Sequence, residues 1–167
     1  MTSLSLDHHD NLTAGAASRV TSAITATSAS PLLTILRVTL GVVMLPHGLQ
    51  KTVGWFGGYG FDATMSFFGT LGIPAFFAFL AIAAESAGAV ALIAGLATRI
   101  AAFGVGTTIA VAALMAHLQN GFFMNWTGQQ KGEGFEYHLL VVAMAVVLMI
   151  GGAGRYSLDR LLTRGSK

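Results

Sequence analysis

The chain has 167 residues, of which 54% are hydrophobic and 10% are charged, and its mean hydropathy is +0.69. Water-soluble domains of this size rarely combine so much apolar surface with so little charge, so the composition indicates an integral membrane protein of one domain. The sequence has no cysteine, which excludes a disulfide, a thiolate metal site and a CxxC redox couple. The net charge of +2 comes largely from a short basic segment at the carboxy terminus, so we expect no nucleic-acid partner.

The first 30 residues are rich in Ser, Thr and Ala and contain no continuous apolar segment. A secretory signal needs an apolar core, so we predict a disordered cytoplasmic tail over residues 1–30. Its Asp-His-His-Asp run at residues 7–10 could chelate a metal. Polar groups on a mobile tail are usually only solvated, however, and we assign this run no role.

Four apolar segments then follow, each long enough for a helix that crosses about 30 Å of hydrocarbon, which takes roughly 20 residues. The first begins at Pro31, a favourable residue for a first helical turn. A loop rich in glycine and aromatic residues and a short amphipathic segment over 62–71 separate it from the second. Small residues recur every four positions in the third, from Gly104 to Ala116, which predicts close helix packing. We expect the spans at residues 31–50, 74–96, 99–117 and 135–152.

An even number of spans places both termini on the same side of the membrane. Basic residues are more numerous on the terminal side, and the positive-inside rule then makes both termini cytoplasmic. The prediction is an all-α fold, an up-down bundle of four membrane helices over residues 31–162, with a basic cytoplasmic tail over 163–167. Near the carboxy terminus, Arg155 and Asp159 are four residues apart and could pair on a helix, while Arg160, Arg164 and Lys167 would contact an anionic inner leaflet.

Several polar side chains are predicted at the outward end of the spans, at one height in the membrane. They are His47, Gln50, Lys51, His117, Glu136 and His138. Helices of a bundle can direct such groups into a shared inward pocket. Two of them also have a plainer interpretation. His117 could serve simply to cap its span, and Lys51 could extend its ammonium group to water.

Two charges are predicted deeper in the membrane, Arg37 in the first span and Glu85 in the second. Charges at such depth are nearly always paired or face a cavity. Arg37 and Glu85 are within reach of each other, so we expect them to pair as a structural salt bridge. The alternative is that Glu85 carries protons or contacts a ligand.

The segment Pro46-His47-Gly48 closes the first span. Pro46 removes the hydrogen bond to the carbonyl group of Val42 and usually kinks a helix. Gly48 has no side chain to obstruct its surroundings. We predict that this segment bends the end of the helix and directs His47 into a polar pocket shared with His117, Glu136 and His138. Alternatively, the helix simply frays there into the headgroup layer.

These residues together resemble the DoxX family of small bacterial membrane proteins. The matching segments run in order over residues 32–162: His47-Gly48-Leu49-Gln50-Lys51, Phe56-Gly57-Gly58, Glu85 with Gly88, Thr98-Arg99, His117 through Phe123, Gly134-Phe135-Glu136-Tyr137 and Gly154-Arg155-Tyr156-Ser157-Leu158-Asp159. The resemblance implies a four-helix protein of the bacterial inner membrane that is loosely linked to oxidoreduction. Related proteins are subunits of a thiosulfate:quinone oxidoreductase, whereas most members have no assigned reaction.

Three functions are compatible with this sequence. The first is a quinone-linked membrane subunit, in which His47, Lys51, His117 and His138 hold the ligand while Glu85 and Glu136 carry protons. The second is a haem or metal site formed by two imidazole groups at equal height. The absence of a paired-histidine motif and the small residues of the third span argue against it. The third is a non-catalytic subunit that anchors a partner oxidoreductase in the lipid bilayer or forms a homo-oligomer.

Overall fold

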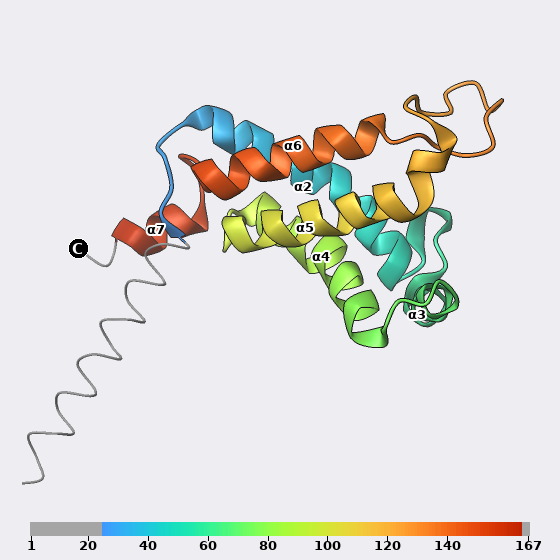
Figure 1. Ribbon diagram of the computed structural model, residues 1–167. Helices are drawn as coiled ribbons and strands as arrows, with labels where there is room; N and C mark the ends of the chain where they lie inside the picture. The colour runs from blue at the N-terminus through green and yellow to red at the C-terminus, as the bar shows by residue number, and fades with distance from the viewer. Residues whose placement is uncertain (1–24, 165–167) are drawn as a thin grey trace, which may run out of the picture.

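The computed structural model describes residues 25–164, which form helices and loops without a strand. The long helices are α2 (Pro31–Thr52), α4 (Ala75–Ala94), α5 (Thr98–Ala112) and α6 (Glu136–Gly151). Successive long helices run in opposite directions along one bundle axis (Figure 1). The predicted all-α, up-down four-helix bundle is therefore confirmed.

Three helical stretches are long and apolar enough to cross a membrane: Pro31–Thr52, Ala75–Ala94 and Thr98–Asn120, with 22, 20 and 23 residues. The first two lie within two residues of the predicted spans at every boundary. The fourth helix, α6, is apolar but has only 16 residues, about 24 Å of helix. It is thus shorter than the predicted span over 135–152, and loop residues must complete its crossing.

Five shorter elements join or follow these helices: η1 (Trp55–Gly57), α3 (Gly60–Thr70), η2 (Ala113–His117), η3 (Leu118–Asn120) and α7 (Leu158–Arg164). Helix α3 corresponds to the predicted amphipathic segment. It is seen nearly end-on in Figure 1, so it lies across the bundle axis. The end of the third span widens into a π-helical turn, η2, and then narrows into the 3₁₀ turn η3.

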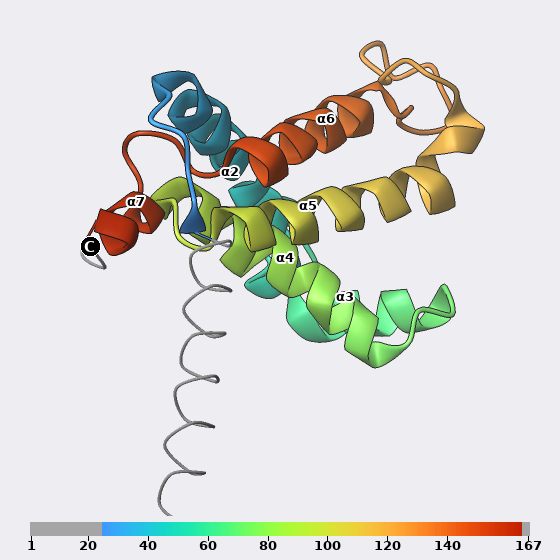
Figure 2. The same ribbon diagram turned by 60° about the vertical axis from the view of Figure 1, so that its left-hand side comes forward.

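Different segments of the chain lie at the two ends of the bundle. The loop end carries residues 53–74 and 121–135, and the terminal end carries residues 26–30, the 95–97 hairpin and residues 152–164. Both views place the start of α2 and helix α7 at the same end (Figures 1 and 2). The described beginning and end of the chain therefore lie on one side, as an even number of spans requires.

The core lies where α2 packs against α4, and α5 against α4 and α6. Large apolar side chains fill it, among them Leu40, Met44, Leu92, Val105 and Leu148. Glycine makes the closest helix contacts possible. A methyl group at Gly48 would lie 2.4 Å from the carbonyl oxygen of Glu85, so α2 and α4 touch backbone to backbone there. Gly48 therefore brings α4 against α2 instead of bordering a cavity, and α2 continues through Pro46 as one helix up to Thr52.

The small residues of the third span contribute only in part to this packing. A methyl group at Gly104 would lie 3.3 Å from Cβ of Ala84. Ala116, at the other end of the predicted stripe, is exposed. A closer contact is at Gly106 between α5 and α6, where a methyl group would lie 2.9 Å from Cβ of Ala145.

Arg37 is buried at the terminal end, and the prediction that it pairs with Glu85 is wrong. Its guanidinium group donates hydrogen bonds to main-chain carbonyl groups at the ends of other helices. The acceptors are the carbonyl oxygens of Leu92, Ile93 (2.6 Å), Ala153 (3.0 Å) and Tyr156 (2.6 Å). The last carbonyl groups of a helix lack their usual partners, and Arg37 binds two of them at the end of α4 together with two in the segment after α6. Its role is therefore to join α2, α4 and the segment after α6.

Asp159 forms the second junction of the terminal end, and the predicted Arg155–Asp159 pair does not form. The Asp159 carboxylate accepts hydrogen bonds from the main-chain N–H groups of Ala97 (2.7 Å) and Thr98 (2.9 Å). Its own N–H donates to the carbonyl oxygen of Gly95 at 2.8 Å. The α4–α5 hairpin is thereby fixed to α7.

The last residues of the predicted amino-terminal tail also contact the terminal end of the bundle. Gly154 N–H donates to the Thr27 hydroxyl group at 2.6 Å, and the Arg99 guanidinium group donates to the carbonyl oxygen of Ala26. Residues 26–30 thus contact the bundle. The remainder of that tail, the Asp7–Asp10 run and the last three residues lie outside the described residues.

Candidate functional site

An ion pair links α2 to α4 near the loop end. The Lys51 ammonium group lies 2.5 Å from the Glu85 carboxylate, and the two side chains are 24% and 5% exposed. The close contact at Gly48, one turn before Lys51, brings the two helices near enough for the pair to form. The alternative prediction that Lys51 extends its ammonium group to water is therefore wrong, because this group pairs with Glu85.

Lys51 also forms part of a cavity between the end of α2 and α3, which we call the Lys51 cavity. It has a volume of about 260 Å³, and its lining residues are Gln50, Lys51, Gly57, Gly58, Tyr59, Thr64, Phe67 and Phe68. Gly58 allows the loop to lie on α2, because a methyl group there would be 2.3 Å from the carbonyl oxygen of Gln50. The cavity thus combines one ammonium group with three aromatic rings.

Hydrogen bonding leaves polar groups available in this cavity. The Gln50 amide donates to the carbonyl oxygen of Phe56 and holds the loop in place. The buried Thr64 hydroxyl group makes no hydrogen bond within residues 25–164. An ammonium group has three protons and Glu85 takes one of them. Lys51 and Thr64 can therefore both donate to a ligand.

Three histidines and a tyrosine form a row on the opposite side of the pair, between α2, α5 and α6. The His47 ring lies 6.0 Å from the Tyr137 ring, measured between centroids. The Tyr137 and His138 rings are 5.6 Å apart, and the His138 and His117 rings are 4.0 Å apart. The structure therefore brings together the three histidines predicted from the sequence. We call these four residues the histidine row.

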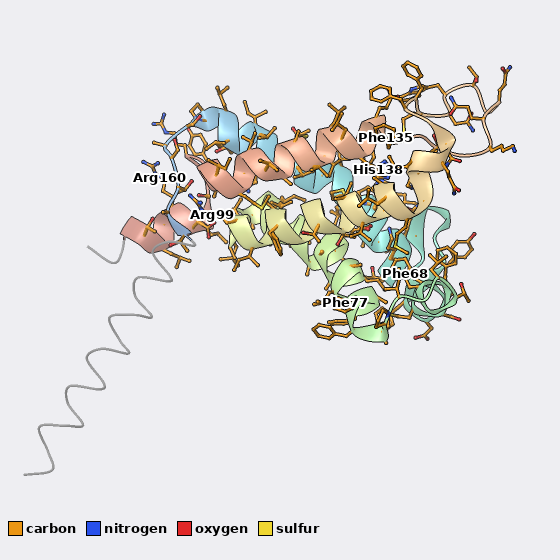
Figure 3. The ribbon with its side chains drawn as sticks, in the orientation of Figure 1. Phe68, Phe77, Arg99, Phe135, His138 and Arg160 are labelled. Carbon is orange, nitrogen blue, oxygen red and sulfur yellow. The ribbon has the colours of Figure 1, made fainter. Side chains whose placement is uncertain are left out.

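The two histidines at the far end of the row differ in their partners. Nδ1 of His117 lies 2.9 Å from the carbonyl oxygen of Glu133, and because a carbonyl group only accepts, this nitrogen must donate. His138 is only 6% exposed, and its Nδ1 atom has no hydrogen-bond partner in the described part of the chain. His138, labelled in Figure 3, is thus a buried imidazole whose Nδ1 atom is unpaired in the described part of the chain.

The ion pair and the row are close enough to influence each other. The Glu85 carboxylate acts electrostatically on His47 and on Tyr137, and His47 acts on His138. Glu85 thus pairs with Lys51 of the cavity and lies within electrostatic range of the row, whose other end contacts the 121–135 loop through Glu133. The predicted single pocket is in fact a cavity and a row on two sides of one ion pair.

Glu136 is placed apart from the cavity by its hydrogen bonds. Its carboxylate accepts from the main-chain N–H of Met124 at 2.9 Å and from the indole N–H of Trp126 at 3.3 Å. It holds the 121–135 loop against the start of α6. Two aspects of the site were missed in the sequence analysis, the aromatic lining contributed by α3 and the participation of Tyr137. The amphipathic pattern of α3 and the position of Tyr137 beside His138 were the available signals.

Metal and haem chemistry can be tested against this geometry. Among residues 25–164, no three His, Asp or Glu side chains are grouped closely enough to hold a metal ion. The His117 and His138 rings, 4.0 Å apart, are in contact, so a porphyrin cannot lie between them. The donors present suit a ligand that accepts hydrogen bonds.

Comparisons with known proteins agree with this architecture. The family model named DoxX matches residues 32–118, a little over half of the chain and the part that holds α2 to α5. The chain belongs to the DoxX family. Two relatives are each 32% identical to it: the Bacillus subtilis (strain 168) protein named "Putative oxidoreductase CatD" and the Escherichia coli (strain K12) "Inner membrane protein YqjF". The alignments cover 80% and 76% of this chain and 88% and 92% of the relatives. No solved structure matches the chain significantly.

Membership of the DoxX family and the apolar helices together establish a membrane protein. The family match contains His47, Lys51, Glu85 and His117 and ends just after the last of these. The ion pair, the Lys51 cavity and half of the histidine row therefore lie inside the matched region. The name of one relative refers to oxidoreduction, and the name of the other to the inner membrane.

Proposed function

We propose that this DoxX protein is a membrane subunit linked to oxidoreduction, and that it binds a quinone-like ligand in the Lys51 cavity. The observation that carries the proposal is that Lys51, which is paired with Glu85, lines an aromatic cavity near the end of the membrane helices. A partly buried charged pair is costly to form unless it serves structure or function. Here Lys51 keeps protons that are not used by Glu85.

The chemistry of a quinone headgroup fits these groups. Lys51 and the Thr64 hydroxyl group can each donate to a carbonyl oxygen, and Tyr59, Phe67 and Phe68 offer faces for a planar ring. Pockets for drug-sized ligands measure about 300–1,000 Å³, so 260 Å³ suits a single ring whose tail remains in the lipid. Reduction of a quinone to a quinol takes up two electrons and two protons. The electrons would come from a partner oxidoreductase subunit.

The remaining polar groups would supply the protons. Glu85 pairs with Lys51 of the cavity and lies within electrostatic range of His47, the first member of the histidine row. His117, at the other end of the row, contacts the 121–135 loop through Glu133. We assign Glu85 the role of proton carrier and the row that of a route to the loop end. Glu136, which the sequence suggested as a second carrier, is bound to the loop and supports this end of the route.

Extraction of the purified protein and mass spectrometry of the extract test the proposal. The wild-type protein in mild detergent should release about one quinone per chain. Lys51→Met should release little, because it removes the ammonium donor and keeps the length of the side chain. Lys131→Met is the matched control, since Lys131 is exposed in the 121–135 loop. Equal quinone content in the Lys51 and Lys131 variants, or phospholipid alone from the wild type, would contradict a quinone site in this cavity.

A second candidate function is a non-catalytic subunit that anchors an oxidoreductase or assembles with further copies of itself. Its support is that Arg37, Asp159 and Glu136 all satisfy main-chain groups and leave little polar chemistry outside the site. This function predicts that the extract contains only phospholipid. It also predicts that an oxidoreductase subunit co-purifies with wild-type protein and with the Lys51→Met variant alike.

A further inference from the structure

A groove at the terminal end, far from the Lys51 cavity, is not used by the proposed function. It has a volume of about 560 Å³, and its lining residues are Ala94, Arg155, Tyr156, Ser157, Leu158, Arg160 and Leu161. We call it the basic groove. In Figure 3 Arg160 lies at one end of the bundle and His138 at the other. A ligand of this groove would therefore contact the opposite membrane surface.

The positive charge of the groove is not compensated by any residue that the structure describes. The guanidinium groups of Arg155 and Arg160 make no hydrogen bond or ion pair with any residue from 25 to 164. Arg155 only lies over the Tyr156 ring, 5.5 Å from its centroid. The neighbouring acid, Asp159, is 1% exposed, and both of its oxygens are already bound to main-chain N–H groups. Two cations thus face the groove without a counter-ion.

The floor of the groove is apolar. Leu158 and Leu161 are 41% and 63% exposed and lie on the same helix as Arg160. Ala94 adds the end of α4, a membrane helix. Cationic and apolar groups side by side match an anionic amphiphile, with its charge at the guanidinium groups and its chain on the leucines. A free inorganic anion would leave the apolar part unused.

The groove is fixed in position by hydrogen bonds. The Ser157 hydroxyl group donates to the carbonyl oxygen of Gly154 and accepts from the N–H of Arg160. Asp159 and Arg37 join this segment to the α4–α5 hairpin and to α2. The two arginines are therefore held on a rigid base, which lowers the entropy that is lost when a ligand binds.

We propose that the basic groove binds an anionic phospholipid of the leaflet that faces the termini. The phosphate group lies between Arg155 and Arg160, whose planar guanidinium groups suit phosphate oxygens. One acyl chain lies over Leu158 and Leu161 and continues along the membrane helices. Because the groove lies where α4 and α6 leave the membrane, it is at the depth of the lipid phosphates.

Native mass spectrometry of the detergent-purified full chain, titrated with dioleoyl-phosphatidylglycerol, tests the proposal. The wild-type protein should retain one phosphatidylglycerol, whereas dioleoyl-phosphatidylcholine should bind more weakly. The double variant Arg155→Gln/Arg160→Gln should lose about 30-fold in affinity for phosphatidylglycerol, as expected for two cations near the headgroup surface. Arg155→Lys/Arg160→Lys should bind with intermediate affinity, since lysine keeps the charge without the planar fork. Lys131→Gln, at the loop end, should bind like wild type.

Equal affinity of wild type and the glutamine double variant for phosphatidylglycerol would overturn the proposal. So would equal affinity of the wild type for phosphatidylcholine, or stabilisation by inorganic phosphate as large as that by phosphatidylglycerol. The glutamine double variant is shown to be folded if its melting temperature in lipid-free detergent equals that of the wild type. Quinone content is measured separately at the loop end, so the two proposals can fail independently.

Discussion

At the scale of single residues, Glu85 is a buried charge that needs a partner inside the bundle. The Lys51 ammonium group 2.5 Å away neutralises it. Glu85→Gln removes this charge and leaves Lys51 partly buried without its partner. Loss of one member of a buried pair costs about 3–5 kcal/mol, and because Lys51 is 24% exposed we expect about 2 kcal/mol. Thermal unfolding in detergent measures the loss.

A double variant separates this effect from simple loss of packing. Lys51→Met/Glu85→Gln has no unpaired charge, so it should recover most of the stability that Glu85→Gln loses. A double variant that is no more stable than Glu85→Gln would mean that the ion pair is not what stabilises the α2–α4 contact. The same two proteins report on the function, since both lack the Glu85 carboxylate and should fail to transfer protons.

The sequence identified the important residues better than their partners. His47, His117 and His138 were expected together and are together. The prediction that Arg37 pairs with Glu85 was wrong. It used the depth of each residue in the membrane, estimated from its position along the helix, and this depth does not show in which direction a long side chain extends. Lys51 extends back along α2 to Glu85, and Arg37 binds main-chain carbonyl groups of helix ends that no sequence pattern displays.

At the scale of the helices, Gly48 determines how closely α2 and α4 approach. Gly48→Ala would place a methyl group 2.4 Å from a main-chain oxygen, and backbone cannot yield as a side chain can. We expect a loss of about 3 kcal/mol, at the upper end of the usual cost of overpacking. Gly69→Ala in α3 is the control, because nothing lies within 4 Å of its added methyl group. It should be neutral or slightly stabilising in the same melting experiment, and equal destabilisation by both changes would argue against the close contact.

Asp159 has a comparable effect on the α4–α5 hairpin. Asp159→Asn keeps one carbonyl oxygen and replaces the other acceptor with an NH₂ group, which cannot accept from Ala97 or Thr98. A buried N–H without a partner costs about 1–3 kcal/mol. We expect a loss of that size and faster hydrogen exchange at residues 95–98. Exchange that stays at the wild-type rate would show that the hairpin is held by other contacts.

Helix boundaries could be predicted from the sequence where a residue at the boundary itself starts or ends the helix. Pro31 begins α2 after Ser30, whose hydroxyl group accepts from the N–H of Leu32, and Gly95 ends α4 with a φ of 72°. The π-helical turn at residues 113–117 could not be predicted. It orients His117 toward Glu133, a contact with a loop that is distant in sequence, and such contacts outweigh local preference.

At the scale of the whole molecule, the remaining question is which side of the membrane each end faces. The structure strengthens the charge asymmetry used in the sequence analysis. Lys51 at the loop end is neutralised by Glu85, while Arg155 and Arg160 at the terminal end have no acidic partner within residues 25–164. Positive charge near the ends of spans favours the cytoplasmic side. The terminal end is therefore predicted to be cytoplasmic and the Lys51 cavity to open outward.

The lack of cysteine makes this orientation directly measurable. Trp126→Cys at the loop end and Tyr156→Cys at the terminal end replace side chains that are 85% and 67% exposed. In intact cells a membrane-impermeant maleimide should label the first variant and not the second, and both should react after the membrane is permeabilised. The reverse pattern would place the basic groove outside and the Lys51 cavity inside. A quinone in that cavity would then exchange its protons with the cytoplasm, so the orientation decides from which side the proposed reaction draws them.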